Sequence, residues 1–198
     1  GAVSISDATL TSGSTAINIA DLQAPLTIKN VAATATTNNG LYLGAISAAA
    51  TSISITGGSF KGDARGIYFP AVPAATSISI SSAEVEATGS SNEALDFAST
   101  VAGAVAIEGA TVSQPGAMEG IYFQGAVTAA VSISDTTATA GGSCIMFADL
   151  QAPLALTNVV ATAASVGNSL SLQATSAAVT TIDVTGGTFK GAHRGMYF

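Results

Sequence analysis

Residues 51–69 read TSISITGGSFKGDARGIYF, and a close copy, TTIDVTGGTFKGAHRGMYF, occupies residues 180–198. Weaker versions of the same pattern precede and separate these two copies. A unit that recurs at a fixed period is typical of solenoids and other repeat proteins, in which each unit packs only against its neighbours. The repetition therefore predicts one continuous domain over residues 1–198 and not two separate globular domains.

Each unit begins with two apolar residues that flank a third residue, and a turn-forming residue follows two places later. The apolar pairs are Val3/Ile5, Leu26/Ile28, Ile53/Ile55, Ile78/Ile80, Val105/Ile107, Val131/Ile133, Leu154/Leu156 and Ile182/Val184. The residues two places after the pairs are Asp7, Asn30, Gly57, Ser82, Gly109, Asp135, Asn158 and Gly186. Alternation predicts a short strand, and these four residue types tolerate a tight corner. The pattern thus predicts a strand that enters a bend.

Two more short strands follow the bend in each unit. The inward residues of the second strand are Leu10, Ala33, Phe60, Val85, Val112, Ala138, Ala161 and Phe189. Those of the third strand are Ile17/Ile19, Leu41/Leu43, Ile67/Phe69, Leu95/Phe97, Ile121/Phe123, Ile145/Phe147, Leu170/Leu172 and Met196/Phe198. Apolar spacing of two, many β-branched residues and recurrent glycines disfavour helices. The sequence predicts an all-β parallel β-solenoid with three short strands per coil and about eight coils of roughly 25 residues.

The coils themselves repeat with a longer period. Residues 3–69 match residues 131–198 almost throughout, with one extra residue near 166–168. The chain therefore divides into a five-coil super-repeat, 3–130, and part of a second copy, 131–198. Neither end carries a polar capping unit, and an uncapped solenoid exposes strand edges that can pair with another chain. We expect end-to-end stacking with further repeats of the same chain or with copies of itself, and the initial Gly indicates an excised or processed piece.

Composition narrows the class of protein. Hydrophobic residues make up 48% of the 198 residues and charged residues only 9%, so the chain can bury a large core. The net charge of −7 argues against a nucleic-acid partner, whose phosphates require a basic surface. One cysteine allows no disulfide within the chain, and no apolar run approaches the ~20 residues of a membrane span. A lightly charged surface rich in Ser and Thr predicts an extracellular or cell-surface location.

The three-strand coil with Gly, Asn or Asp corners resembles the right-handed parallel β-helix of the pectate-lyase-like class. It is most similar to the repetitive stalks of surface adhesins and autotransporter passengers, and the resemblance covers the whole chain. Enzymes of that class would need clustered Asp ligands for calcium and a basic catalytic residue, and the sequence has no such cluster. The calcium-binding repeat GGxGxDx is also missing, because Gly57-Gly58-Ser59-Phe60 departs from it. The resemblance implies right-handed winding and a stalk-like role, without enzymatic activity.

Tyrosines provide one set of candidate contact residues. Tyr42, Tyr68, Tyr122 and Tyr197 each fall between the two inward residues of a third strand, and they are therefore expected to point outward. Tyrosine buries contact area at low entropic cost, so an exposed row favours contact with a sugar or a partner protein. The other residues in these middle positions are Asn18, Asp96, Met146 and Ser171, which interrupt the row.

Basic residues provide the second set of candidates. Lys61, Asp63, Arg65 and Tyr68 form the densest charged patch, which suits a carbohydrate or an anionic group. The alternative interpretation is a surface charge ladder, in which Lys61 pairs with Glu86 one coil further on. The retained surface-contact candidates are Tyr42, Tyr68, Tyr122, Tyr197, Lys61, Arg65, Lys190 and Arg194.

The remaining reactive residue types give no catalytic, cofactor or metal site. His193 is the only histidine and has no companion ligands at metal-binding spacing, so it is expected to be a solvent-facing loop residue. Cys144 aligns with Ala, Gly and Ser in the other coils and is expected to be a small core residue. Glu84, Glu86, Glu93 and Asp96 form an acidic stretch in the fourth coil. Glu84 and Glu86, two residues apart on one strand face, are expected to form a solvated edge, and no catalytic role is expected for the stretch.

Two main functions remain open from sequence. The first is a structural segment of a long extracellular or cell-surface filament or adhesin shaft, which assembles by coil stacking and needs no cofactor. The second is a polysaccharide-binding or polysaccharide-cleaving β-helix that uses the Lys61, Arg65 and Tyr68 side. A third, ice binding by Ser/Thr faces, is disfavoured because Lys29, Glu108 and other charges interrupt those faces.

Overall fold

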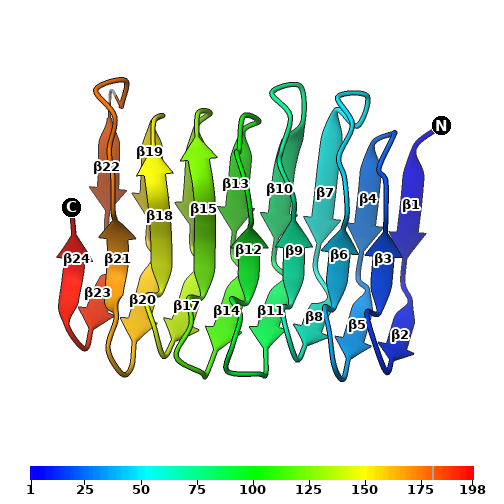
Figure 1. The fold of residues 1–198 in the computed structure, drawn as a ribbon, viewed down its shortest axis with the longest axis horizontal. Helices are drawn as coiled ribbons and strands as arrows, with labels where there is room; N and C mark the ends of the chain where they lie inside the picture. Colours follow the sequence, from blue (N-terminus) through cyan, green and yellow to red (C-terminus); the bar gives the residue numbers. More distant parts are fainter. Residues whose placement is uncertain (180) are drawn as a thin grey trace.

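The computed structural model describes residues 1–179 and 181–198, and it is built from 24 β-strands. The strands form three parallel sheets, here named A, B and C, each containing eight strands. Successive strands of the chain belong to sheets A, B and C in turn, so that three strands make one coil (Figure 1). The two termini lie at opposite ends of the stack (Figure 1). In the described part of the chain, no helix is long and apolar enough to cross a membrane.

The strands have the following bounds. Sheet A contains β1 (Val3–Ser6), β4 (Leu26–Lys29), β7 (Ser52–Thr56), β10 (Ser77–Ser81), β13 (Val105–Glu108), β16 (Val131–Ser134), β19 (Leu154–Thr157) and β22 (Ile182–Thr185). Sheet B contains β2 (Thr9–Ser12), β5 (Ala32–Ala35), β8 (Ser59–Gly62), β11 (Glu84–Ala87), β14 (Thr111–Gln114), β17 (Thr137–Ala140), β20 (Val160–Ala163) and β23 (Thr188–Gly191). Sheet C contains β3 (Ile17–Ile19), β6 (Leu41–Leu43), β9 (Ile67–Phe69), β12 (Leu95–Phe97), β15 (Ile121–Val127), β18 (Ile145–Leu150), β21 (Asn168–Leu172) and β24 (Arg194–Tyr197). We number the coils one to eight from the N-terminus.

The register of the sheets confirms the predicted parallel β-solenoid. In sheet A the first residue of each apolar pair faces the first residue of the next, from Val3 opposite Leu26 to Leu154 opposite Ile182. The predicted inward residues of sheets B and C are aligned in the same way, for example Val85 with Phe60 and Leu95 with Ile67. Seven turns separate Val3 from Ile182, at about 26 residues per turn. The apolar alternation therefore fixes both the pairing and the buried face.

All eight predicted corner residues have a positive φ. Five of them are not glycine, with φ between 48° at Asp135 and 53° at Asn158. Left-handed backbone is rare outside Gly, Asn and Asp, because a Cβ there meets the neighbouring carbonyl. Some corners also carry a side-chain ladder, in which Asn30 Nδ2 donates to Asp7 Oδ1 at 3.1 Å. The corner is thus a conformational requirement repeated in every coil.

A ladder of aromatic rings occupies the core behind sheet C. Phe69, Phe97, Phe123 and Phe147 are fully buried, and successive rings stack with centroids 4.4–4.9 Å apart. The planes of neighbouring rings differ by 10° or less. Because parallel in-register strands place identical residues one strand spacing apart, a repeated Phe necessarily stacks on its copy.

A fourth inward column lies in the returns between sheets C and A, and the sequence analysis does not predict it. Isolated parallel bridges join Leu22 to Ile46, Val72 to Val101, Val101 to Val127 and Leu150 to Thr175. The apolar residues among these are buried. In coils five and six the return is regular enough to extend β15 and β18 to 7 and 6 residues, with a shift in register between Phe123 and Ala126. The repeated apolar residue five or six places after the start of the third strand is the signal for this column.

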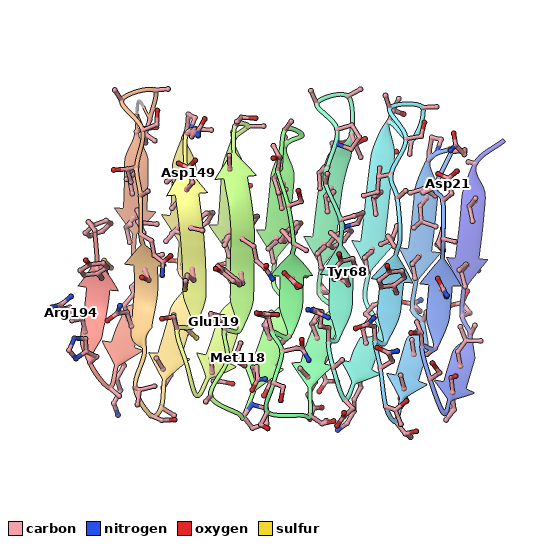
Figure 2. The ribbon with its side chains drawn as sticks, in the orientation of Figure 1. Asp21, Tyr68, Met118, Glu119, Asp149 and Arg194 are labelled. Atoms are coloured by element: carbon pink, nitrogen blue, oxygen red, sulfur yellow. The ribbon has the colours of Figure 1, made fainter. Side chains whose placement is uncertain are left out.

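The super-repeat is visible in the side-chain contacts. Gln23 Nε2 donates to Asp21 Oδ2 at 2.6 Å, and Gln151 Nε2 donates to Asp149 Oδ2 at the same distance. Asp21 follows β3 in coil one and Asp149 lies in β18 in coil six, and Figure 2 shows both near the same edge of the stack. The Asn30–Asp7 ladder likewise returns as Asn158–Asp135, again at 3.1 Å. Each of the three sheets nevertheless runs through all eight coils.

Candidate functional site

The outward column of sheet C brings several of the candidate residues together. Register places Tyr42 beside Tyr68, Tyr68 beside Asp96, and Asp96 beside Tyr122. The rings of Tyr42 and Tyr68 stack with centroids 4.9 Å apart and planes inclined by 13°. Asp96 separates Tyr122 from this pair, and Tyr197 lies at the far end in β24, where it is 40% exposed. The four tyrosines therefore point outward as predicted but do not form one row.

Arg65 is held by the coil that follows it. Its Nε lies 2.7 Å from Asp96 Oδ2 and 3.6 Å from Glu93 Oε2, in coil four. Its guanidinium also lies over the ring of Tyr68, 5.2 Å from the centroid, which is a cation–π geometry. Two carboxylates thus neutralise Arg65, and the side chain is not available as an independent site for an anion.

Two carboxylates of the acidic stretch are buried, and the solvent-facing edge is limited to Glu84 and Glu86. Asp96 is 0% exposed and Glu93 is 5% exposed, whereas Glu84 is exposed and Glu86 half-buried on β11. Arg65 and Glu93 both lie two residues before a third strand, in successive coils, so stacking places them side by side. The shared position of Arg65 and Glu93 in successive coils is the sequence signal for this ion pair.

Opposing effects act on the protonation of Asp96. Its carboxylate accepts hydrogen bonds from Arg65 Nε at 2.7 Å and from Gln124 Nε2 at 2.9 Å, and both favour the charged form. Burial and then the neighbouring Glu93 outweigh them and raise the pKa of Asp96 to about 6. Burial removes the carboxyl from water and so disfavours its ionised form, and at Asp96 this effect exceeds the stabilisation by both donors. Asp96 is thus a carboxyl group that can gain or lose a proton near neutral pH.

Glu119 extends this group into coil five. Burial raises its pKa, with Glu93 adding to the effect and a backbone hydrogen bond opposing it. Burial also raises the pKa of Tyr122, to which Glu119, Glu93 and Asp96 contribute. Glu93 Oε2 is buried and has no hydrogen-bond partner. We call Glu93, Asp96 and Glu119 the acidic cluster. Figure 2 labels its member Glu119, just before β15, and Tyr68, which neighbours Asp96 in sheet C.

Asp96 and Glu93 are buried, and both oxygens of Asp96 accept hydrogen bonds within the protein. The surface that a ligand could reach over the acidic cluster is formed by half-buried side chains, namely Tyr68, Glu119, Tyr122 and Gln124. A carboxylate, an amide and aromatic rings together suit a ligand rich in hydroxyl groups. Within residues 1–179 and 181–198, no group of three His, Cys, Asp or Glu side chains is arranged to hold a metal ion.

Lys61 forms the charge ladder that the sequence analysis gave as one interpretation. Its Nζ lies 2.9 Å from Glu86 Oε2, the outward residue at the same position one coil further on. Both side chains are partly exposed, at 43% and 27%, so the pair contributes little to stability. Lys61 and Arg65 therefore both pair with carboxylates of coil four, which argues against an anionic ligand at these two residues.

Cys144 and His193 lie where the sequence predicts. Cys144 is fully buried, and its Sγ donates to the carbonyl oxygen of Ala138 at 2.9 Å. Burial raises the pKa of this thiol to about 12, which leaves almost no thiolate at neutral pH. His193 is exposed in the last coil. Neither position has the surroundings of a nucleophile or a metal ligand.

A shallow groove runs along the outer face of sheet A, across coils four to eight. Small outward residues line much of it, among them Ser79, Ala106, Ser132 and Ala155, and its volume is about 850 Å³. Asp183 is the one charged residue among those that line it in the described chain. The groove lacks the convergent polar groups found at the acidic cluster, so sheet C carries the better candidate site.

Comparison with known proteins adds no family assignment. No protein-family model matches this chain, and neither the curated proteins nor the solved structures gave a match to it.

Proposed function

We propose that this chain is a non-catalytic structural segment of a long filament or adhesin shaft at the cell surface or outside the cell. The observation that carries the proposal is the stack itself: three continuous sheets and one continuous core pass through eight coils. Repetition of one coil extends a rigid body along one axis, because each coil contacts only its neighbours. The extracellular location rests on the low charge and on the Ser- and Thr-rich surface.

The two end coils support assembly by stacking. At the N-terminal end Val3 is 39% exposed, and at the C-terminal end Ile182 is 37% and Phe198 63% exposed. The equivalent residues of the interior coils, such as Ile53 and Phe97, are buried. The strands of coils one and eight each pair on one side only. Such edges bind another strand readily, since both backbone groups and apolar surface are gained.

Electron microscopy and sedimentation of the native protein would test this function. We expect rods whose length increases with protein concentration and whose axial period corresponds to a coil rise of about 4.8 Å. Phe198→Asp should shorten the rods, because it places a charge on the apolar end surface. Val166→Asp is the matched control: Val166 is 72% exposed on the loop between β20 and β21 in coil seven, outside the terminal coil, and rod length should not change. Particles of single-chain size at every concentration would reject assembly by stacking.

The acidic cluster supports a second candidate, a polysaccharide-binding or polysaccharide-cleaving face on sheet C. Because Asp96 and Glu93 neutralise Arg65, a neutral polysaccharide fits better than an acidic one. Binding of laminarin, with polygalacturonate as the acidic comparison, would test it by gel retardation and by release of reducing ends. Tyr68→Ala and Tyr122→Ala should abolish binding, whereas Tyr197→Ala, in the copy that lacks the acidic cluster, should not. Equal retention by all three variants would reject the site.

A further inference from the structure

Coils three and eight are copies, but only coil three has a following coil in the structure. In coil three, Lys61 and Arg65 are both matched by carboxylates of coil four: Lys61 Nζ lies 2.9 Å from Glu86 Oε2, and Arg65 Nε lies 2.7 Å from Asp96 Oδ2. Glu93 adds a third carboxylate, 3.6 Å from Arg65 Nε. The junction between coils three and four is therefore matched in charge at two separate places, on sheets B and C.

Coil eight presents the same two cations in the same positions. Lys190 is in register with Thr162, as Lys61 is with Thr34 in coil two. The guanidinium of Arg194 lies over the ring of Tyr197 at 4.8 Å, as that of Arg65 lies over Tyr68 at 5.2 Å. Among the described residues, neither Lys190 nor Arg194 forms an ion pair. Figure 2 shows Arg194, the first residue of β24, at the open end of the stack.

The apolar surface of coil eight also repeats that of coil three. The inward residues of coil three on which coil four packs are Ile53, Ile55, Phe60, Ile67 and Phe69. The corresponding residues of coil eight are Ile182, Val184, Phe189, Met196 and Phe198. The sizes are similar at each place, so a coil that fits coil three also fits coil eight.

We propose that the open edge formed by β22, β23 and β24 docks a β-solenoid coil of the coil-four type, with carboxylates at the positions of Glu86, Glu93 and Asp96. This inference rests on the proposed stacking function and specifies the partner that stacking selects. The N-terminal edge of a second copy is a poorer partner. It places Thr11 at the position of Glu86 and Asn18 at that of Asp96, so both cations remain unmatched. Charge complementarity, more than apolar contact, thus determines which coil follows.

The test extends the full chain with one more coil. A second copy of residues 70–99 is added directly after Phe198, as Pro70 follows Phe69. A neutral extension is identical except for Glu86→Gln, Glu93→Gln and Asp96→Asn within the added copy. Each extended chain is made with and without Lys190→Gln and Arg194→Gln. Hydrogen exchange reports whether the added strands are protected, and thermal unfolding gives Tm.

We expect the cation substitutions to lower Tm only when the added coil is acidic, by about 2–4 °C for a chain of this size. The difference should shrink in 1 M NaCl, where screening acts over about 3 Å. If both extensions are protected but the cation substitutions act equally on them, charge matching is rejected while stacking stands. If neither extension becomes protected, the edge does not accept a coil of the coil-four type and this proposal fails, whereas rod formation by the unextended chain tests the proposed stacking function separately. If the unextended chain forms rods and Lys190→Gln with Arg194→Gln leaves their length unchanged, the edge binds the N-terminal coil of a second copy. That result would reject charge matching as the basis of partner choice.

Discussion

At the scale of single residues, the corners show how strongly backbone conformation restricts this sequence. Gly57 and Gly58 form one corner, with φ of 63° and 83°. The single-residue corner at Gly109 has φ of 59°. A Cβ at Gly58 would lie 2.3 Å from the carbonyl oxygen of Val31, whereas a Cβ at Gly109 would meet nothing closer than Ser82 Oγ at 3.6 Å. The two glycines therefore share a conformation but differ in the space around them.

This difference predicts unequal effects of two alanine substitutions. Gly58→Ala should lower the free energy of unfolding for two reasons. A residue with a Cβ costs about 1–2 kcal/mol in left-handed backbone, and the backbone of coil two must also move to make room for it. Gly109→Ala should incur only the left-handed cost, and it serves as the matched control. Urea unfolding would measure both free energies of unfolding. Equal losses would show that the contact with Val31 relaxes without cost.

The pKa of Asp96 predicts a pH dependence of stability with a definite sign. Because the folded-state pKa is raised to about 6, the protonated carboxyl is favoured by folding. The resulting contribution to the free energy of unfolding is complete below about pH 4, the ordinary Asp value, and is lost as pH rises through 6. Relative to Asp96→Asn, the wild-type chain should thus lose roughly 2 kcal/mol between pH 4 and pH 7.

Carbon-13 NMR of the Asp96 carboxyl provides the direct measurement, with an expected midpoint near pH 6. Asp63→Asn is the control for the stability profile, because Asp63 is exposed near Arg65 in the same coil. A wild-type profile parallel to that of Asp96→Asn would mean that the ion pair with Arg65 keeps Asp96 ionised throughout.

At the scale of the element, the phenylalanine ladder ties neighbouring strands of sheet C together. Phe123 stacks on Phe97 at 4.4 Å and on Phe147 at 4.5 Å, so its removal would leave a cavity with rings on both sides. The same column holds Leu43 in coil two and Leu172 in coil seven. The position requires a large apolar side chain more than it requires an aromatic ring.

Two substitutions of Phe123 should therefore differ in their effects. Phe123→Ala should lower the free energy of unfolding by about 3–5 kcal/mol, the usual range for loss of a buried ring. Phe123→Leu should cost less than about 1.5 kcal/mol, because it places in coil five a residue that the column already accepts. Denaturant unfolding of the three proteins would measure this. A large loss in Phe123→Leu would indicate that ring stacking contributes more than the filling of space.

The elements were predictable from sequence because each depends on residues close together in the chain. Alternation predicted the strands, and Gly, Asn, Asp or Ser at each corner predicted the bends. Gly, Asn and Asp accept the required φ most readily, and Ser82 adopts it in coil four. The return ladder through Leu22 and Ile46 was missed, because its residue lies at a variable distance from the third strand: five places after Ile67 at Val72, but six places after Leu95 at Val101. The acidic cluster was missed for a different reason. Arg65 and Asp96 are 31 residues apart, and their contact exists only once the coils are stacked.

At the scale of the whole molecule, stability should decrease from the middle of the stack toward its ends. Coils one and eight have a neighbour on one side only, whereas the interior coils are covered on both. In repeat proteins the stability of a unit is the sum of its intrinsic folding free energy and the free energies of its interfaces with neighbouring units. Terminal units have one interface fewer and therefore open first. Amide hydrogen exchange should show the strongest protection between β10 and β18 and the weakest in β1–β3 and β22–β24. Uniform protection along the chain would instead indicate a single cooperative unit.

The opposite placement of the two termini has a mechanical consequence (Figure 1). A pulling force applied through the ends of the chain is directed along the stack, and so it acts on the hydrogen bonds between coils. A terminal coil has one such interface and can peel away while the rest of the body stays intact. Each peeled coil of about 26 residues releases roughly 90 Å of extended chain, against a folded rise near 5 Å. A shaft built in this way would lengthen in steps under load and would absorb energy before it broke.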